Sequence, residues 1–489
     1  MNTHSLLRGP IVGMLAAAGL MLASSPARAD VKLPSIFGSD MVLQRGSACP
    51  VWGWADNGEK VSVEFAGQTH GATAEIDGKW MVHLRPMKAM AEPHTLTVKG
   101  KNTVSLTGVL VGEVWLCSGQ SNMEWSVTSS DRAQEEIAAS ANPLIRHIKI
   151  PHRPAFSPEQ DVPSEGWKVS GPANTGSFTA VGYFFARSLV KELNVPVGLI
   201  GSNWGGTRIE PWTPPVGFQK TPALKEISDK LDTFPTRTMG RDPRNPLKTV
   251  RSINPQTPLA LYNGMIHPLV PFAIRGALWY QGESNNGEGM LYYEKMKALV
   301  NGWRTVWNNP TMPFLFVQLA PYNYGANRGG DLPGIWEAQE MSLHIPHTGM
   351  AVTTDIGNVR DIHPRNKQEV GRRLALWALA KTYGKDVDVY SGPLYRSHKI
   401  DGQKVRIRFH HTGGGLVARD GKPLTHFTIA GSDGTWMPAE AMIDGDEVVV
   451  WNKSLTDPTA VRFGWNQLAE PNLANKEGLP AGPFRTDRK

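Results

Sequence analysis

The stretch VLVGEVWLCSGQSN at residues 109–122 decides the fold of this 489-residue chain. Residues 109–117 are apolar except for Gly112 and Glu113, and such a run predicts a buried strand. Polar residues follow at once and put Ser121 just beyond the end of that strand. A serine hydroxyl is a weak nucleophile unless a base lies within hydrogen-bond reach and a further group orients that base. Other parts of the chain must therefore supply both groups.

Strand and helix patterns alternate through residues 108–387. We predict strands at residues 109–117, 197–200, 274–280, 313–319 and 350–354, and helices at residues 181–193, 291–307, 335–344 and 365–383. This alternation is typical of βαβ units around a parallel sheet, in which ligands bind at the carboxyl ends of the strands. Residues 214–260 show little periodicity, and we predict a long loop with short helices that covers the site.

The two flanks of this α/β region have the pattern of β domains. Residues 30–107 contain short strand-like runs beside turn sequences such as Asp56-Asn57-Gly58, which predicts a small β-sandwich. Residues 388–489 form a second predicted β domain, in which residues 404–409 alternate between polar and apolar.

Residues 1–29 have the features of a secretory signal peptide. Arg8 gives a positive start, an apolar run follows, and Ala27-Arg28-Ala29 has the small-x-small form of a cleavage site. We therefore expect cleavage after Ala29 and an exported protein, either periplasmic or secreted. No later stretch is long and apolar enough to predict a membrane span.

Composition excludes several classes of function. The net charge is +7, but the basic residues are scattered and form no dense stripe, so we expect no nucleic-acid partner. The two cysteines, Cys49 and Cys117, lie in apolar surroundings and are predicted to be buried free thiols. The chain contains no Cys-x-x-Cys or His-Glu-x-x-His spacing, so we expect no metal and no cofactor. The sequence predicts no particular oligomeric state.

Polar sequences follow four of the predicted strands, at residues 119–122, 201–207, 281–285 and 355–363. At such a turn, backbone N–H groups can hold an oxyanion, and the Ser121 and Gly206 amides are the two candidates. Side-chain amides would complete the site, and the candidates are Asn285, Gln281 and Gln120. Taken singly, each sequence also fits a helix cap, a tight turn or a polar loop rim.

The fourth polar sequence supplies a candidate base. Pro364 favours extended backbone at His363, and in an extended chain residues i and i+2 point to the same side. Asp361 can therefore lie beside His363 and orient its ring, while Asp355 and Glu283 remain alternatives. His267 is a weaker candidate for the base.

The chain resembles the sialate O-acetylesterase family and its bacterial relatives within the SGNH hydrolase superfamily. Three sequences carry most of the resemblance: WLCSGQSNMEW at residues 115–125, WYQGESN at residues 279–285 and DIHPRNK at residues 361–367. Residues 41–44 and 475–481 are also similar, so the resemblance extends over nearly all of the chain beyond the signal segment.

The resemblance implies a fold and an activity. The fold would be a flavodoxin-like three-layer α/β/α hydrolase domain at residues 108–387, with N- and C-terminal β-sandwich-like accessory domains. The activity would be removal of O-acetyl groups from sugars, most of all from O-acetyl sialic acids. By the same resemblance Ser121 is the nucleophile, His363 the base, and Gly206 and Asn285 belong to the oxyanion hole.

Two features depart from the superfamily pattern. The acid and base are spaced Asp-x-His rather than Asp-x-x-His, and Asn285 lies three residues after Gly282 rather than two. Acetylxylan or another acetylated polysaccharide is an alternative substrate, and a non-catalytic glycan-binding protein is a remote alternative. A peptidase or lipase is disfavoured, because Met123 stands where a Gly-x-Ser-x-Gly elbow requires its second glycine.

Overall fold

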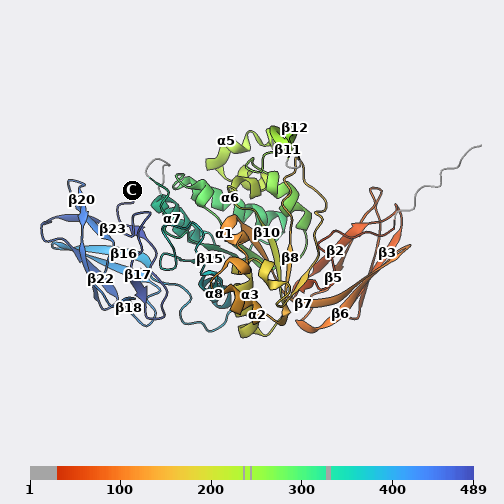
Figure 1. The fold of residues 1–489 in the computed structure, drawn as a ribbon, viewed down its shortest axis with the longest axis horizontal. Coiled ribbons are helices and arrows are strands. Elements are labelled where there is room, and N and C mark those ends of the chain that lie inside the picture. Colours follow the sequence, from red (N-terminus) through yellow and green to blue (C-terminus); the bar gives the residue numbers. More distant parts are fainter. Residues whose placement is uncertain (1–29, 235–236, 243–244, 326–331, 489) are drawn as a thin grey trace, which may run out of the picture.

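The structure, a computed structural model, describes residues 30–488 except for 235–236, 243–244 and 326–331 (Figure 1). N-terminal strands form one end of the molecule, helices surround a sheet in the middle, and C-terminal strands form the other end (Figure 1). The expected signal segment lies outside the described residues. Within the described residues, no helix is both long and apolar enough to cross a membrane.

The central sheet is built around one long strand, β7 (Thr103–Gly119). Its strands lie in the order β15-β14-β13-β7-β10-β8-β9, and every neighbouring pair is parallel except β8 and β9. The other strands are β8 (Asn142–Lys149), β9 (Lys168–Ser170), β10 (Val197–Asn203), β13 (Gly276–Tyr280), β14 (Phe314–Val317) and β15 (Thr348–Ala351). A strand is present at each of the five predicted places, but β15 begins two residues before the predicted 350–354 and ends at Ala351. Strands β8 and β9 were not predicted.

The direction in which the chain crosses the sheet changes at β7. After β7 the chain forms β8 and β10 on one side, and it then crosses to form β13, β14 and β15 on the other. Gly119 at the end of β7 is in register with Asn203 of β10 and Tyr280 of β13, so three strands end at one level. A reversal of this kind leaves a crevice beyond the strand ends, where ligands bind in open α/β sheets.

Four main helices accompany the sheet. They are α3 (Ala180–Leu193), α6 (Leu291–Val306), α7 (Leu332–Met341) and α8 (Lys367–Trp377), and all four were predicted. The helix expected at residues 365–383 begins two residues later, because the Asn366 side chain accepts a hydrogen bond from the Glu369 N–H and caps the helix. It ends in a π-helical turn, Ala378–Thr382.

Shorter helices connect these elements. The α-helical ones are α1 (Ser121–Glu124), α2 (Ala133–Ala138), α4 (Pro215–Gln219) and α5 (Lys225–Ser228). A second π-helical turn spans Tyr262–Ile266. The 3₁₀ turns are Val127–Ser129, Thr175–Ser177, Glu210–Trp212, Pro222–Leu224, Leu231–Thr233, His267–Leu269, Glu283–Asn285 and Ser342–His344.

The segment 214–260 is only partly a loop. Its short helices α4 and α5 agree with the prediction, but the backbone also forms an antiparallel hairpin of β11 (Arg237–Asp242) and β12 (Asn245–Ile253). Charged residues, glycine and proline interrupt any polar and apolar alternation in these two strands, which is why their pattern predicted a loop.

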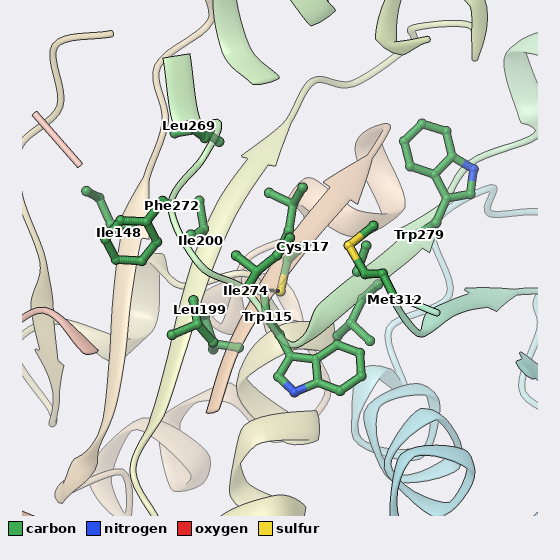
Figure 2. Packing of buried hydrophobic residues seen from close by; sticks show 14 of the residues in the cluster. Trp115, Cys117, Ile148, Leu199, Ile200, Leu269, Phe272, Ile274, Trp279 and Met312 are labelled. Atoms are coloured by element: carbon green, nitrogen blue, oxygen red, sulfur yellow. Dashed lines mark hydrogen bonds between the residues drawn. The ribbon is translucent and has the colours of Figure 1, made fainter. Parts of the chain in front are cut away.

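Buried apolar side chains fill the space between sheet and helices (Figure 2). Trp115 and Cys117 of β7 and Trp279 of β13 are among them (Figure 2). A Cβ atom at Gly182 of α3 would lie 2.8 Å from the Cys117 sulfur, so α3 can pack this closely only with glycine there. Cys49 and Cys117 are both buried and free, as predicted.

The N-terminal strands join the central sheet through β7. Its first half pairs with β6 (Met90–Lys99), which pairs in turn with β3 (Lys60–Phe65), while β1 (Val42–Gln44) runs parallel to the middle of β7. The remaining strands are β4 (Gln68–Thr73) beside β3, and the pair β2 (Cys49–Trp54) and β5 (Lys79–Leu84). The boundary expected between residues 107 and 108 therefore falls inside a single strand.

The C-terminal region is made of strands alone among its regular elements. One sheet has the order β16-β17-β22-β21, another has the order β20-β19-β23-β25, and β18 pairs with β24. The strands are β16 (Leu394–Asp401), β17 (Lys404–His410), β18 (Leu416–Ala418), β19 (Phe427–Gly431), β20 (Trp436–Pro438), β21 (Glu440–Asp444), β22 (Glu447–Trp451), β23 (Pro458–Phe463), β24 (Leu473–Asn475) and β25 (Phe484–Arg485).

Candidate active site

Ser121 begins helix α1 directly beyond the end of β7. The turn before it depends on Gly119, which has a φ of +132° and whose Cβ, if present, would lie 2.2 Å from the Tyr280 carbonyl oxygen. The Gln120 N–H donates to that same carbonyl at 3.0 Å and fixes the turn against β13. The sequence thus places the serine at the switch point of the sheet.

His363 meets Ser121 from the loop between β15 and α8. The distance between His363 Nε2 and Ser121 Oγ is 2.8 Å, a hydrogen bond between residues 242 positions apart. The imidazole stacks on the Trp125 indole with 4.8 Å between ring centroids and 17° between planes. The predicted serine and histidine are therefore brought together in the geometry of a nucleophile and its general base.

The surroundings of His363 keep its imidazole neutral. Burial lowers the pKa of His363, the Lys367 charge lowers it further, and only the Asp361 carboxylate acts in the opposite direction. A neutral imidazole is the form that can accept a proton from Ser121 near pH 7.

The Asp361 carboxylate does not hydrogen-bond to the imidazole. Its Oδ1 lies 3.9 Å from His363 Nδ1, which is beyond hydrogen-bond range, and instead accepts from the His363 backbone N–H at 2.9 Å. The two alternatives are occupied elsewhere: Asp355 pairs with Arg373 through two 2.7 Å contacts, and Glu283 accepts from the Asn122 side chain at 2.6 Å.

Asn122 links the turn at residues 119–122, called the serine turn, to the loop at residues 352–366, called the histidine loop. Its side-chain NH₂ donates to Glu283 Oε1 and, at 3.0 Å, to the Ile362 carbonyl next to His363. Its Oδ1 accepts from Lys367 Nζ at 2.5 Å. Burial raises the pKa of Glu283 and lowers the pKa of Lys367 to about 7, so burial disfavours the charged form of each group.

The backbone amides of Ser121 and Gly206 belong to residues that line one cavity. Gly206 has a φ of +72°, which favours glycine, and lines the same cavity as Ser121. Within the described residues, neither the Ser121 nor the Gly206 N–H donates a hydrogen bond to a protein acceptor. Both amides are thus free to bind an oxyanion.

The turn that carries Gly206 is fixed against α1 by Glu124. Glu124 Oε2 accepts from the Gly205 N–H at 2.7 Å, and its Oε1 lies 2.8 Å from His152 Nε2 and 3.2 Å from Lys149 Nζ. Burial alone would raise the pKa of Glu124, but the hydrogen bond from His152 and the Lys149 charge outweigh it and bring the pKa to about 2.

Asn285 does not face the cavity as an oxyanion donor. Its NH₂ group donates to Glu210 Oε2 and Glu288 Oε2, both at 3.0 Å. Its Oδ1 accepts from the Ile209 N–H at 3.0 Å and from Gln281 Nε2 at 2.7 Å. With both amide hydrogens donated and the side chain buried, Asn285 has none to offer a substrate in this arrangement.

Gln120 is the predicted side-chain amide that lines the cavity. Its Oε1 accepts from Gln281 Nε2 at 3.1 Å and from the Ser284 N–H at 3.2 Å, while its Nε2 donates to no described residue. Gln120 lines the cavity, whereas Gln281 is fully buried behind it. Gln281 therefore orients Gln120 and does not itself reach the cavity.

The cavity at Ser121 has a volume of about 660 Å³, within the ~300–1,000 Å³ common for small-molecule sites. Sequence reasoning missed four of its lining residues, Asn286, Tyr322, Asn323 and Tyr324. Asn286 adjoins a polar sequence that was recognised, and the other three lie a few residues beyond β14, so a search of every strand end would have found them. Across the described residues, no group of three His, Cys, Asp or Glu side chains is placed to hold a metal ion.

Comparison with known proteins points to one family. The model for "Carbohydrate esterase, sialic acid-specific acetylesterase" matches residues 111–237 and 249–380. Among curated proteins, a sialate O-acetylesterase of Rattus norvegicus is 28% identical, with 97% of both chains covered. A sialate O-acetylesterase of Pongo abelii is 30% identical, with 95% of this chain and 94% of that one covered.

A solved structure is also similar over almost the whole chain. It is described as a novel carbohydrate acetylesterase from Xanthomonas citri and is 37% identical in sequence, with a TM-score of 0.84. The match covers 94% of this chain and 100% of that chain, so it includes the flanking β regions as well as the central sheet.

Proposed function

Because the chain belongs to the carbohydrate esterase family of sialic acid-specific acetylesterases, we propose that it releases acetate from O-acetylated sugars through Ser121 and His363. The 2.8 Å contact between His363 Nε2 and Ser121 Oγ carries this proposal. It joins a candidate nucleophile to a candidate base inside a cavity of ligand size.

The reaction proceeds in two acyl transfers. The Ser121 oxygen bonds to the acetyl carbon while its proton passes to His363 Nε2. The bond from that carbon to the sugar oxygen then breaks, and the sugar oxygen takes the proton from His363. Water attacks the acetyl-serine and gives a proton to His363, which returns it to Ser121 as acetate leaves.

Three donors would hold the oxyanion. The backbone amides of Ser121 and Gly206 are free for this purpose, and Gln120 Nε2 takes the place first assigned to Asn285. Asp361 acts through its charge near the imidazolium and through its bond to the His363 backbone, since its carboxylate does not reach Nδ1.

Two sugar classes are candidates for the substrate. The names of the curated relatives support O-acetyl sialic acids. One observation favours a neutral sugar, such as that of acetylxylan or another polysaccharide: no Arg or Lys is among the described residues that line the cavity. A sialic acid carries a carboxylate, and proteins usually bind carboxylates with such cations.

The architecture and location belong to the same proposal. We assign residues 108–387 to a three-layer α/β/α hydrolase domain of flavodoxin-like type, and residues 30–107 and 388–489 to β-sandwich-like accessory domains. The parallel sheet and its crossover at β7 support the first assignment. The form of residues 1–29 supports export to the periplasm or the exterior.

The test of this function is acetate release by the Ser121→Ala variant. With an aryl acetate as substrate, we expect kcat to fall at least about 10³-fold, because loss of a nucleophile disables the whole triad. Ser126→Ala is the matched control, since among the described residues the Ser126 hydroxyl hydrogen-bonds only with the Ser129 hydroxyl, at 3.2 Å. Near-normal turnover by a folded Ser121→Ala protein would contradict the mechanism.

A substrate panel separates the sugar classes. Acetate release is measured from O-acetyl sialic acid and from acetylxylan, together with the positions of the acetyl groups that remain. Glycan retention without any acetate release would instead support the non-catalytic alternative.

A further inference from the structure

The segment at residues 321–325, here called the tyrosine segment, forms one wall of the cavity that contains Ser121. Tyr322, Asn323 and Tyr324 all line this cavity. The two tyrosine rings meet edge to face, with 4.9 Å between centroids and 88° between planes. Their arrangement offers aromatic surface beside an otherwise polar site.

The tyrosine segment has no helix or strand of its own, and other parts of the molecule hold its backbone. The Tyr322 N–H donates to the Gln467 carbonyl at 2.9 Å, and the Tyr324 N–H donates to Gln467 Oε1 at 3.3 Å. Between them, the Asn323 N–H donates to the Val359 carbonyl at 3.0 Å.

These contacts join three regions that lie far apart in the sequence. Gln467 belongs to a turn of the C-terminal region, in which the Ala469 N–H donates to the Asn466 carbonyl at 2.9 Å. Val359 belongs to the loop that carries His363, and a Cβ at Gly357 in that loop would lie 3.0 Å from Pro321. The C-terminal region and the histidine loop thus both contact the backbone of the tyrosine segment and hold it in place.

We propose that the tyrosine segment is the wall on which the sugar ring of the substrate binds, and that Gln467 is a positioning residue that holds this wall. Aromatic side chains give large, rigid contact area together with a polar hydroxyl, which suits a sugar that has both C–H faces and hydroxyls. The C–H face of the sugar packs against the rings while Ser121 meets the ester. The inference rests on the proposed function and names its binding surface.

It follows that the C-terminal region acts on substrate choice through a direct contact. A small aryl acetate can react with Ser121, His363 and the oxyanion donors without a sugar on the wall, so its reaction should depend on the wall less than that of an acetylated sugar does. An acetylated sugar needs the wall as well. Damage to the wall should therefore change the ratio of the two activities, which a general loss of stability would not do.

The first experiment uses Gln467→Met, which has similar length but lacks the side-chain oxygen that accepts from the Tyr324 N–H. The Tyr324 N–H then keeps only its 3.1 Å contact with the Tyr322 carbonyl, which lies within the tyrosine segment itself. We expect KM for an acetylated sugar to rise about 2- to 10-fold, the loss of one hydrogen bond, with kcat changed less. Gln467→Glu keeps an acceptor oxygen and should stay near the wild type. Met442→Ser is the control, since Met442 on β21 is 50% exposed in the same C-terminal region.

The second experiment removes the rings themselves. Tyr322→Ala and Tyr324→Ala should raise KM for the acetylated sugar more than KM for the aryl acetate. Tyr322→Phe and Tyr324→Phe keep the aromatic face and should recover most of the affinity. Melting temperatures of all variants show whether each one is folded.

The outcomes separate this inference from the proposed function. If the wild type releases no acetate from any acetylated sugar, the proposed function fails and the wall fails with it. If the wild type does release acetate while the alanine and methionine variants keep the ratio of sugar to aryl acetate KM, only the wall is wrong. A raised sugar KM in Gln467→Met, restored in Gln467→Glu, supports the inference.

Discussion

Asn122 and Asn285 are both buried amides that follow neighbouring strands, yet their hydrogen bonds serve different parts of the molecule. Asn122 follows β7 and joins the serine turn to the histidine loop, through the Ile362 carbonyl and Lys367. Asn285 follows β13 and joins Glu210 to Glu288, and it is not among the described residues that line the cavity.

The difference lies in the charges around each amide. Asn285 sits among two carboxylates and the two cations that pair with them, Arg208 and Lys295. Asn122 has one carboxylate, Glu283, and one ammonium, Lys367, as partners. Burial raises the pKa of Glu283 and lowers the pKa of Lys367, and both shifts favour the neutral form. We infer that Asn285 mainly stabilises the fold, whereas Asn122 mainly sets the distance between Ser121 and His363.

The largest effect is expected for Asn285→Ala, and it should be on stability. Loss of the amide leaves the Ile209 N–H without its acceptor and takes one of three acceptors from Gln281 Nε2. It also removes a donor from the buried Glu210 carboxylate and from the half-buried Glu288 carboxylate. We expect the free energy of unfolding to fall by about 2–4 kcal/mol, measured by urea denaturation. Asn301→Ala, on the exposed side of α6, is the control.

The alternative role of Asn285 predicts a different pattern. Removal of an oxyanion donor would lower kcat about 10²–10³-fold. A folded Asn285→Ala protein with that loss and with unchanged stability would show that Asn285 turns toward the substrate during the reaction.

The next effect is expected for Asn122→Ala, and it should be on turnover. Without Asn122 the Ile362 carbonyl loses its donor, and the histidine loop is no longer tied to the serine turn. A misplacement of this kind costs about 10²-fold in kcat, while KM for an aryl acetate should change much less.

A second variant shows which half of the Asn122 amide matters. Asn122→Asp keeps an acceptor for Lys367 but removes both donors. We expect its kcat to fall as far as that of Asn122→Ala. If both variants melt early yet keep their turnover per folded molecule, Asn122 is only structural and the contrast with Asn285 disappears.

The two asparagines also show what the sequence could predict. Apolar runs mark the ends of β7, β10 and β13, and because ligands bind at the carboxyl ends of parallel strands, Ser121, Gly206 and residues 281–285 were expected together. The final hydrogen bonds of each amide were not predictable. The two carboxylates that accept from Asn285 come from the 3₁₀ turn at Glu210–Trp212 and from the loop at Glu288. Lys295 of helix α6 pairs with both carboxylates, and only the folded chain brings these groups together.

Strand β8 was missed for a related reason. Its sequence, NPLIRHIK, contains Arg146 and His147, which read as polar interruptions of an apolar run. Both side chains are nevertheless buried, and His147 stacks on Phe178 with 4.6 Å between centroids. Burial of polar residues through tertiary packing cannot be seen in a pattern that assumes polar residues face water.

A smaller effect, on pH dependence, is expected for Lys367→Met. The pKa of Lys367 is about 7, so its charge is present over the acidic side of the activity profile, where it lowers the pKa of His363. The reaction needs neutral His363, so a lowered pKa extends activity to lower pH. Removal of the charge raises that pKa again, and the acidic limb of kcat/KM should move to higher pH.

The measurement is kcat/KM against pH with an aryl acetate. Lys385→Met, which removes an exposed lysine beyond α8, should leave the acidic limb in place. A limb that stays fixed, or moves to lower pH, in Lys367→Met would show that the ammonium does not act on His363.

The smallest effect is expected for Asp361→Asn. The asparagine oxygen can still accept from the His363 N–H, and the lost charge lies 3.9 Å from Nδ1 on a side chain that is 36% exposed, where solvent weakens it. We expect kcat/KM to fall less than about 10-fold, and the acidic limb to move to lower pH because Asp361 raises the pKa of His363.

Asp361→Ala should lower kcat/KM more than Asp361→Asn does, since it also removes the 2.9 Å hydrogen bond from the His363 N–H that shapes the histidine loop. A triad carboxylate bonded to Nδ1 behaves differently, because its Asp→Asn change costs about 10⁴ in kcat. A loss of that size in Asp361→Asn would mean that the carboxylate closes on Nδ1 in the reacting complex. The histidine loop would then rearrange during the reaction while the Asn122 contacts keep the serine turn in place. Asn122 would therefore contact a segment that moves during the reaction, whereas Asn285 would not.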